Sequence, residues 1–370
     1  MLHVLAEDAV AGTELMVANL ILRSDSGVVR NDLATLQGPG PIAERVEEAG
    51  PDRAASLGGR GGLPVAAWRL ARLLHRRDYD IVNAYGLKAS VVTRVLVRLL
   101  VRGSVFVCGV RGLHVTDVER LDSPKARIAS LIERLLSPLV DTYDANSRAA
   151  LEQLVRLGIG PDRLVHIPNG LDLSLWKPRV GAGESSGAPL IVCAARFAPV
   201  KRHADLIEAL AMLEREGRGF RAVLAGEGPE LMEMRALAAR LGLERVVEFP
   251  GRIDGEQMRA LLDGATVACL PSAFEGMPGA LMEAMASGVP VVATDVAGID
   301  ELVVGDESGL LVPPYDPPAL AAALGSVLDD GELRRRLGAG ARRRMEEYFS
   351  LEAMLDAKER LYRGLAAGRG

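Results

Sequence analysis

The sequence predicts an α/β protein built from two doubly wound domains. Short apolar runs alternate with amphipathic stretches along most of the 370 residues, as parallel strands alternate with the helices that cover them. The alternation stops at a stretch rich in Gly, Ser and Pro and then restarts, and a chain of this length is expected to hold two cores. We therefore expect a first domain at residues 1–176, a linker at 177–189, a second domain at 190–350 and a terminal helix at 351–370.

The first domain is expected to be one parallel sheet covered on both faces. Its predicted strands are Leu2–Ala6, Asp32–Gln37, Asp80–Ala84, Val105–Val110, Thr142–Ala145 and a last strand that begins at His166 and ends in the Asn169-Gly170 turn. Its predicted helices are one that ends near Arg23, then Leu63–Arg77, Ala89–Arg102, Lys125–Leu136 and one with Ser147 as its N-cap. In such a sheet the ligand is expected beyond the carboxyl ends of the strands.

The second domain repeats this rhythm. Its predicted strands are Leu190–Ala195, Arg221–Ala225, Arg245–Phe249, Ala265–Leu270, Val289–Ala293 and Gly309–Val312. Its predicted helices are His203–Glu216, Pro229–Leu241, Gly255–Leu262, one that ends at Gly288 and one that begins at Pro317. A final helix is expected from Leu351.

The composition argues against several classes of function. The net charge of −5 is small for this size, so nothing indicates nucleic-acid binding. Cys108, Cys193 and Cys269 fall in separate apolar runs, which excludes a CxxC metal pair and favours a reducing compartment. We see no signal peptide and no apolar run of about 18 residues that would span a bilayer. We therefore expect a cytoplasmic protein.

The most informative stretch runs from Ser272 to Pro290, between two apolar strands. Its helix begins near Pro278, so Glu275 is expected in the loop at the helix mouth and Glu283 inside the helix. Open backbone N–H groups and the helix dipole favour a phosphate there, and carboxylates accept hydrogen bonds from sugar hydroxyls. The stretch therefore suggests a nucleotide sugar. An acidic helix start stabilised by the dipole is the plainer alternative.

Further candidates follow the other strands of this domain. Arg196 and Lys201 follow a strand and precede a helix, where both cations are able to reach a diphosphate, although two solvated surface cations are the simple alternative. Gly226 lies in a strand-to-helix turn that permits close backbone approach. Arg252 and Ile253 follow the next strand end, where they are suited to wall a base or to form an ordinary turn.

Together these stretches resemble the family-4 retaining glycosyltransferases of the GT-B fold. The matching stretches, in the order of that family, are Ile167–Asp172, Arg196 to Lys201, Ala225–Pro229, Phe249–Arg252 and Glu275 to Thr294. The resemblance covers nearly all of residues 165–310. It implies two Rossmann-like domains that face a central cleft, with the C-terminal helix crossing back to the first domain.

The resemblance also implies roles for individual residues. Arg196 and Lys201 are expected to bind the donor diphosphate and to assist its departure, while Glu283 holds the ribose hydroxyls and Glu275 the hydroxyls of the transferred sugar. The expected donor-site lining is completed by Gly226, Arg252, Ile253, Gly276, Met277, Pro278 and Gly279. The family needs no metal, so we expect neither a metal nor a cofactor.

The first domain resembles the family less closely. Gly12 stands where relatives commonly carry a Gly-Gly pair before a helix, which suggests backbone approach to a phosphate. His114 follows a strand end where relatives often place a histidine close to the reacting sugar, so a catalytic or acceptor-positioning role competes with that of an ordinary loop histidine. Arg111 is a candidate contact for an acidic group of the acceptor.

A last feature is the spacing of Arg94, Arg98 and Arg102, which recur every four residues among Val and Leu. On a helix this predicts a basic stripe beside apolar residues, which suits an anionic membrane surface. A plain solvated helix face is the alternative.

From these observations we expect a transferase that moves a sugar from a nucleoside diphosphate sugar, with uracil as the base expected on family frequency, to a hydroxyl of a glycan or lipid-linked acceptor. The expected setting is cell-surface or exopolysaccharide synthesis, with possible membrane contact as a peripheral protein. A nucleotide-sugar epimerase of the same fold and an inactive nucleotide-binding scaffold are the alternatives. The sequence leaves the sugar, the linkage and the oligomeric state open.

Overall fold

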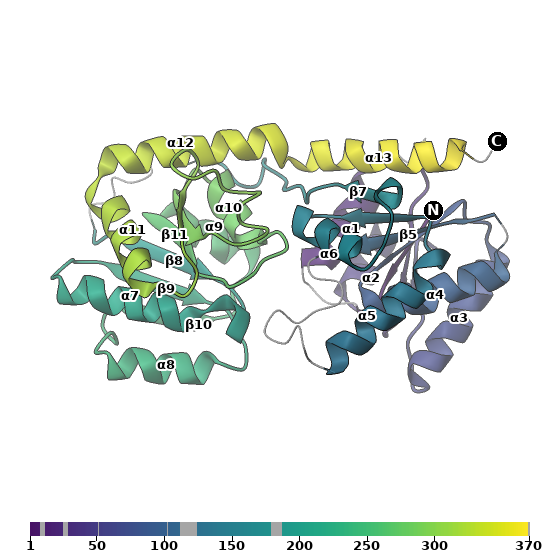
Figure 1. Ribbon diagram of the computed structural model, residues 1–370, viewed down its shortest axis with the longest axis horizontal. Coiled ribbons are helices and arrows are strands. Elements are labelled where there is room, and N and C mark those ends of the chain that lie inside the picture. The colour runs from purple at the N-terminus through teal and green to yellow at the C-terminus, as the bar shows by residue number, and fades with distance from the viewer. Residues whose placement is uncertain are drawn as a thin grey trace. The chain divides into compact units, whose positions relative to one another are not determined.

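The computed structural model describes residues 1–7, 12–24, 29–50, 52–101, 103–111, 124–178 and 187–368. It divides into two compact units. The first comprises Met1–Gly170 together with Glu352–Gly370, and the second comprises Leu171–Leu351 (Figure 1). No helix among the described residues is long and apolar enough to cross a membrane.

The first unit holds a seven-stranded parallel sheet in the order β3-β2-β1-β4-β5-β6-β7. The strands are β1 (Leu2–Leu5), β2 (Asp32–Thr35), β3 (Ala54–Ser56), β4 (Ile81–Tyr85), β5 (Val105–Val110), β6 (Thr142–Ala145) and β7 (Leu164–His166). The helices are α1 (Gly12–Arg23), α2 (Pro41–Glu48), α3 (Gly62–Arg76), α4 (Leu87–Leu100), α5 (Pro124–Leu136), α6 (Arg148–Arg156) and α13 (Leu351–Ala367). The strand order reverses between β1 and β4, which makes this a doubly wound sheet.

Helices cover both faces of this sheet. Leu20 of α1 and Tyr362 of α13 pack with Ile81 on one face. On the other face, Leu70 of α3 and Val97 of α4 pack in the same core as Val82. Ile81 and Val82 are neighbours in β4, and successive strand side chains point to opposite faces, as their separate cores require.

The second unit holds a six-stranded parallel sheet in the order β10-β9-β8-β11-β12-β13. The strands are β8 (Leu190–Ala194), β9 (Arg221–Ala225), β10 (Val247–Gly251), β11 (Val267–Leu270), β12 (Val291–Thr294) and β13 (Leu310–Val312). The helices are α7 (His203–Arg215), α8 (Leu231–Arg240), α9 (Gly255–Asp263), α10 (Gly279–Ala286), α11 (Pro317–Asp329) and α12 (Gly331–Tyr348). Cys193 and Cys269 are buried free thiols in one core of this unit.

The predicted strands and helices are confirmed, except that the last strand of the first unit is shifted: its pairing with β6 stops at His166, where the predicted strand begins. The sequence analysis also missed three elements. The helix α2, with eight residues, and the half-buried strand β3, with three, were missed because both are shorter than the stretch over which periodicity is normally read. The helix α12 was missed because no long loop separates it from α11: the first helix ends at Asp329 and the next begins at Gly331. The break comes from Asp330, whose carboxylate accepts hydrogen bonds from the backbone N–H groups of Glu332 and Leu333 and so caps a new helix.

The predicted basic stripe on α4 is wrong. Arg94 is fully buried, and its guanidinium forms a two-pronged pair with Glu133 of α5 at 3.0 and 2.8 Å. Arg98 pairs with Asp141 at 2.7 Å, and Arg102 lies outside the described residues. The sequence pattern failed because a buried carboxylate on a neighbouring helix makes a buried guanidinium tolerable, which regular spacing alone does not reveal.

Candidate active site

The loop between β11 and α10 places Glu275 in a buried polar cluster. Glu275 is 6% exposed, and its Oε1 accepts hydrogen bonds from Lys201 Nζ and from Ser272 Oγ, both at 2.6 Å. Thr294 at the end of β12 donates its hydroxyl to the carbonyl of Ser272. Both of these hydrogen bonds are made to Oε1, and no described residue donates to Oε2 of Glu275.

Lys201 reaches Glu275 because the two loops are joined through their backbones. The N–H of Ala273 donates to the carbonyl of Val200 at 2.8 Å, which brings the loop after β8 against the loop after β11. Lys201 ends a single helical turn, Pro199–Lys201, and Arg202 then turns the chain with φ +53° before α7 begins. Strands β8 and β11 are neighbours in the sheet, so the ion pair forms at its carboxyl edge.

Three glycines allow neighbouring loops to approach at this edge. Gly226 has φ +144°, and a Cβ there would lie 2.0 Å from the carbonyl oxygen of Ala195. Gly228 is in the same situation against the carbonyl of Phe197. Gly298 has φ +86°, and its Cβ would lie 2.3 Å from the carbonyl oxygen of Glu275. Only glycine combines these backbone angles with these contacts.

The first turn of α10 is uncapped. Its N-cap is Pro278, which has no side chain that accepts a hydrogen bond, and the backbone N–H groups of Gly279 and Ala280 find no acceptor among the described residues. A helix start with open N–H groups carries positive potential, so the loop and helix together form a suitable seat for an anion. Met277 and Pro278 are buried, and they anchor the chain just before α10 begins.

Glu283 lies in the second turn of α10 and is mostly buried. Burial raises the pKa of its carboxyl group to about 7, with the Arg259 guanidinium of α9 acting in the opposite direction. Glu283 is therefore an acid whose charge changes near neutral pH. Such a group accepts hydrogen bonds from hydroxyls strongly when it is ionised.

The structure brings the predicted residues of the second unit to one edge of one sheet. Arg196 follows β8 and is exposed, Gly226 follows β9, and Arg252 with Ile253 follows β10. The N–H of Gly226 donates to the carbonyl of Gly251 at 2.8 Å, which joins the turn after β9 to the end of β10. Since β10, β9, β8 and β11 are consecutive in the sheet, these residues line a continuous edge with Glu275.

The predicted residues of the first unit are placed less informatively. Gly12 begins α1 and is exposed, while His114 lies outside the described residues. Arg111 follows β5 and is buried, with its guanidinium 2.7 Å from a carboxylate oxygen of Asp144. The acceptor roles of Arg111 and His114 remain predictions. Among the described residues, no group of His, Cys, Asp and Glu side chains is arranged to hold a metal ion.

The sequence analysis missed the residues that hold Glu275 in place. Ser272 donates to its carboxylate, Thr294 holds Ser272, and Gly298 gives its backbone room. The detectable signal was weak, because each is a small residue at or within four residues of a strand end. None of these has a charge or a spacing that indicates function.

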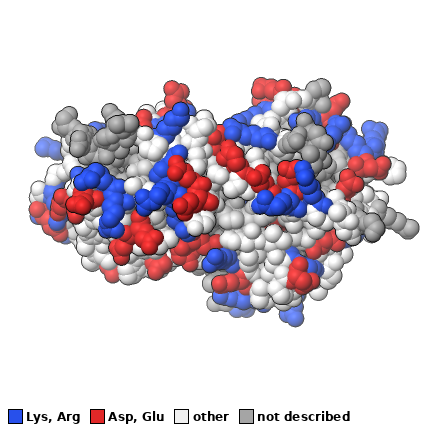
Figure 2. Space-filling view, turned by 90° about the horizontal axis from the view of Figure 1, so that it is seen from above, with Lys and Arg blue, Asp and Glu red and all other residues white. Residues whose placement is uncertain are grey.

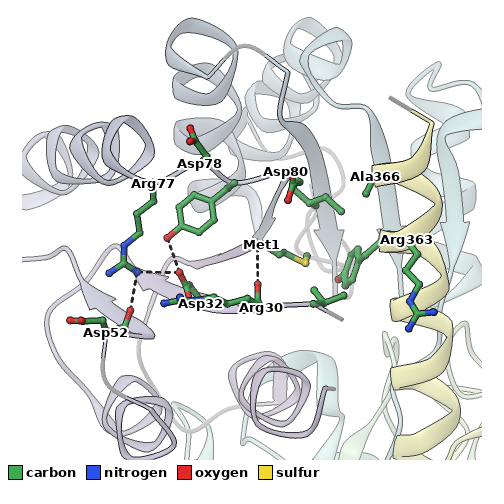
Figure 3. Close-up of a pocket in the computed structure, with 13 residues that line it drawn as sticks. Met1, Arg30, Asp32, Asp52, Arg77, Asp78, Asp80, Arg363 and Ala366 are labelled. Carbon is green, nitrogen blue, oxygen red and sulfur yellow. Dashed lines mark hydrogen bonds and ion pairs between the residues drawn. The ribbon is translucent and has the colours of Figure 1, made fainter. Parts of the chain in front are cut away.

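A cavity of about 540 Å³ lies in the first unit, at the end of the sheet where β1, β2 and β4 start (Figure 3). It holds none of the predicted site residues. Its buried carboxylate, Asp32, accepts hydrogen bonds from Arg77 at 3.1 Å and from Tyr79 at 3.0 Å. These contacts are internal ones that tie the starts of neighbouring elements.

The architecture is that of the GT-B fold, with two parallel Rossmann-like units. The structure aligns with the crystal structure of Anabaena HepE in complex with UDP over 99% of both chains, with a TM-score of 0.82 and 20% identity. Residues 10–175 match the family described as Glycosyltransferase Family 4, and residues 177–344 match Glycosyl transferases group 1. The chain therefore belongs to the family-4 glycosyltransferases.

Curated relatives are similar over part of their length. The chain is 34% identical to the MMP alpha-(1->4)-mannosyltransferase of Mycolicibacterium hassiacum over 60% of this chain and 53% of that protein. It is also 34% identical to WcaL of Escherichia coli, a protein named for colanic acid biosynthesis, over 69% of this chain and 63% of that protein. In both cases the match spans less than two thirds of the relative.

Proposed function

We propose that the protein is a retaining glycosyltransferase that transfers a sugar from a nucleoside diphosphate sugar to a hydroxyl group, without a metal ion. The donor is a UDP-sugar, and the acceptor is a glycan or lipid-linked glycan of cell-surface or exopolysaccharide synthesis. The relatives support this assignment, since one is named a mannosyltransferase and another is named for colanic acid biosynthesis. The complex of HepE with UDP supports the choice of base.

The observation that carries the proposal is the pairing of Lys201 with Glu275 beside the uncapped start of α10. The diphosphate would be bound by Lys201, by Arg196 and by the open N–H groups of the helix. These donors neutralise negative charge as it develops on the departing diphosphate, which lowers the barrier to bond cleavage. Glu275, held by Ser272 and Lys201, would bind a hydroxyl of the transferred sugar.

The ammonium of Lys201 and the hydroxyl of Ser272 both donate to Oε1 of Glu275, and these charge-assisted hydrogen bonds lower the nucleophilicity of the carboxylate. We therefore favour attack by the acceptor on the same face from which the diphosphate leaves. The leaving phosphate then accepts the proton of the attacking hydroxyl. This route retains the anomeric configuration without a covalent intermediate.

The first experiment measures donor binding by thermal shift with the UDP-, GDP-, ADP- and dTDP-sugars. A donor present at 100 times its Kd is expected to stabilise the protein by roughly 2.7 kcal/mol. The variant Lys201→Ala is expected to lose at least tenfold in affinity, while Arg240→Ala, which removes an exposed cation from α8, keeps it. The absence of a shift with every donor contradicts the donor site.

A second measurement separates the three candidate activities. A transferase hydrolyses its donor slowly when no acceptor is present, and Lys201→Ala is expected to abolish that hydrolysis. An epimerase instead releases an epimerised sugar nucleotide, and a scaffold binds the nucleotide and leaves it intact. Each product is identified by chromatography of the same reaction mixture.

A further inference from the structure

The three helices α3, α4 and α5 of the first unit carry almost no negative charge. Neither α3 nor α4 contains an Asp or Glu, and the single acid of α5, Glu133, is fully buried. This is unusual in a chain with 49 acidic residues and a net charge of −5. The exposed cations on these helices include Arg72, Lys88 and Arg134, whereas Arg98 is paired with Asp141. The outer surface of these three helices is called the α3–α5 face below.

The helix α5 is turned so that its polar group faces inward. Glu133 accepts hydrogen bonds from Arg94 of α4 and, at 2.6 Å, from the hydroxyl of Tyr143 of β6. This buried cluster fixes the rotation of α5 about its axis, because a carboxylate without partners would be costly to bury. The orientation of the opposite side of the helix is therefore set by charge pairing and not by its apolar residues.

The side of α5 that faces outward is apolar. Ile128, Leu131 and Leu135 are 59%, 56% and 66% exposed, and their spacing of three and four residues puts them in one stripe. A helix on a water-exposed surface normally shows the reverse arrangement, with its apolar stripe inward. The stripe is thus an exposed apolar surface, and the buried contacts of Glu133 keep it turned outward.

The neighbouring helices extend this surface. α3 packs on α4, and α4 packs on α5, as their places in Figure 1 show. On α4, Leu99 is 74% exposed, and on α3, Trp68 is 57% exposed with the Arg72 guanidinium 4.8 Å from its ring centre. Figure 2 shows a surface on which acidic and basic side chains are interspersed. The α3–α5 face differs in combining cations with large apolar side chains.

We propose that the α3–α5 face docks on an anionic lipid bilayer. The stripe of α5 and Leu99 would enter the boundary between headgroups and acyl chains, Trp68 would lie at the level of the headgroups, and Lys88 and Arg134 would meet lipid phosphates. This combination of an apolar stripe, flanking cations and an interfacial Trp is what surface-lying helices use. A nucleic acid fits less well, because it offers no apolar environment to Ile and Leu.

The test measures co-flotation of the full-length protein with vesicles at physiological salt. Wild type is expected to bind vesicles of phosphatidylcholine with 30% phosphatidylglycerol at least tenfold more tightly than vesicles of phosphatidylcholine alone. The triple variant Ile128→Ser, Leu131→Ser, Leu135→Ser is expected to lose at least tenfold in binding to the anionic vesicles. The double variant Lys88→Gln, Arg134→Gln is expected to lose binding and most of its salt dependence.

The matched control changes exposed apolar residues elsewhere. The double variant Leu175→Ser, Met232→Ser alters two side chains of the second unit that are 52% and 73% exposed, and it is expected to bind vesicles as wild type does. Equal binding to both kinds of vesicle by wild type, unchanged binding by the triple variant, or retention of RNA in place of vesicles each overturns the proposal. The UDP-sugar thermal shift of the triple variant shows that it is folded and reports on the donor site independently.

Discussion

At the scale of single residues, Glu283 combines burial with a proposed role in ribose binding. Burial raises the pKa of this carboxyl group from 4.5 in its ordinary state to about 7 in the folded protein. Between pH 4.5 and about pH 7, the folded state therefore holds a proton that the unfolded state has already released. As the pH rises from about 4.5 to about 7, Glu283 lowers the free energy of unfolding.

The variant Glu283→Gln is expected to remove this pH dependence. Its free energy of unfolding should match that of wild type near pH 4.5 and exceed it by up to about 3 kcal/mol at pH 8, since each pKa unit corresponds to about 1.4 kcal/mol. Urea titrations of both proteins at several pH values measure the difference. Glu214→Gln, an exposed site on α7, is the control and should follow wild type throughout.

The same variant tests the proposed role in binding. If the ionised Glu283 accepts hydrogen bonds from ribose, the affinity of wild type for UDP rises as the pH passes through 7, and Glu283→Gln loses that rise while gaining stability. Calorimetric titrations with UDP at pH 6 and pH 8 measure both effects. A variant that is more stable and binds UDP as well as wild type would leave Glu283 with no place in the donor site.

Gly298 was not among the residues that the sequence singled out, although its backbone shapes the loop of Glu275. Because its φ is +86° and a Cβ would lie 2.3 Å from the carbonyl oxygen of Glu275, Gly298→Ala is expected to displace the Glu275 loop. We expect a loss of about 1–3 kcal/mol in stability and a weaker affinity for the donor. Gly305→Ala is the control, since no atom lies within 4 Å of the added methyl group. Thermal melts with and without UDP compare the two variants.

At the scale of elements, α13 is held on the first unit by polar groups that have no contact with water. Lys358 is fully buried and pairs with Asp144 of β6, to which Arg111 also binds. Farther along the helix, the amide of Asn83 in β4 donates to the hydroxyl of Tyr362 at 3.0 Å. The apolar pattern of α13 predicts a helix at this place in the chain, but it does not predict that a lysine faces the sheet.

Two substitutions in this cluster are expected to differ in severity. Lys358→Met leaves Asp144 paired with Arg111, so we expect a loss of up to about 3 kcal/mol in the stability of the first unit. Asp144→Asn leaves both Lys358 and Arg111 buried without an anion, so we expect the larger loss of about 3–5 kcal/mol. Urea denaturation ranks the variants. Hydrogen exchange of the α13 amides is expected to quicken in both, and the reverse ranking contradicts the assigned pairing.

At the scale of the whole molecule, the two units have separate cores. Each of the described hydrophobic clusters draws its residues from one unit only. All residues of the proposed donor site that lie near Glu275 belong to the second unit. Donor binding and single substitutions are therefore each expected to change the stability of one unit and not of the other.

Calorimetric unfolding is therefore expected to show two transitions. UDP should raise the temperature of the transition that belongs to the second unit and leave the other nearly unchanged, because a ligand stabilises only the state that binds it. Lys358→Met should lower the first unit's transition alone, which assigns the two. A single transition that moves as a whole with UDP would contradict this independence.

The sequence by itself determined the alternation of strands and helices, and with it the two parallel sheets. It also singled out Arg196, Lys201, Glu275 and Glu283, because charges next to strand ends and helix starts are legible from local patterns. Only the tertiary structure decided that Lys201 and Glu275 share one contact, that Arg94 is buried, and that α5 turns its apolar side outward. These outcomes depend on partners such as Glu133 that are distant in the sequence, and a periodic pattern does not say which side chains meet.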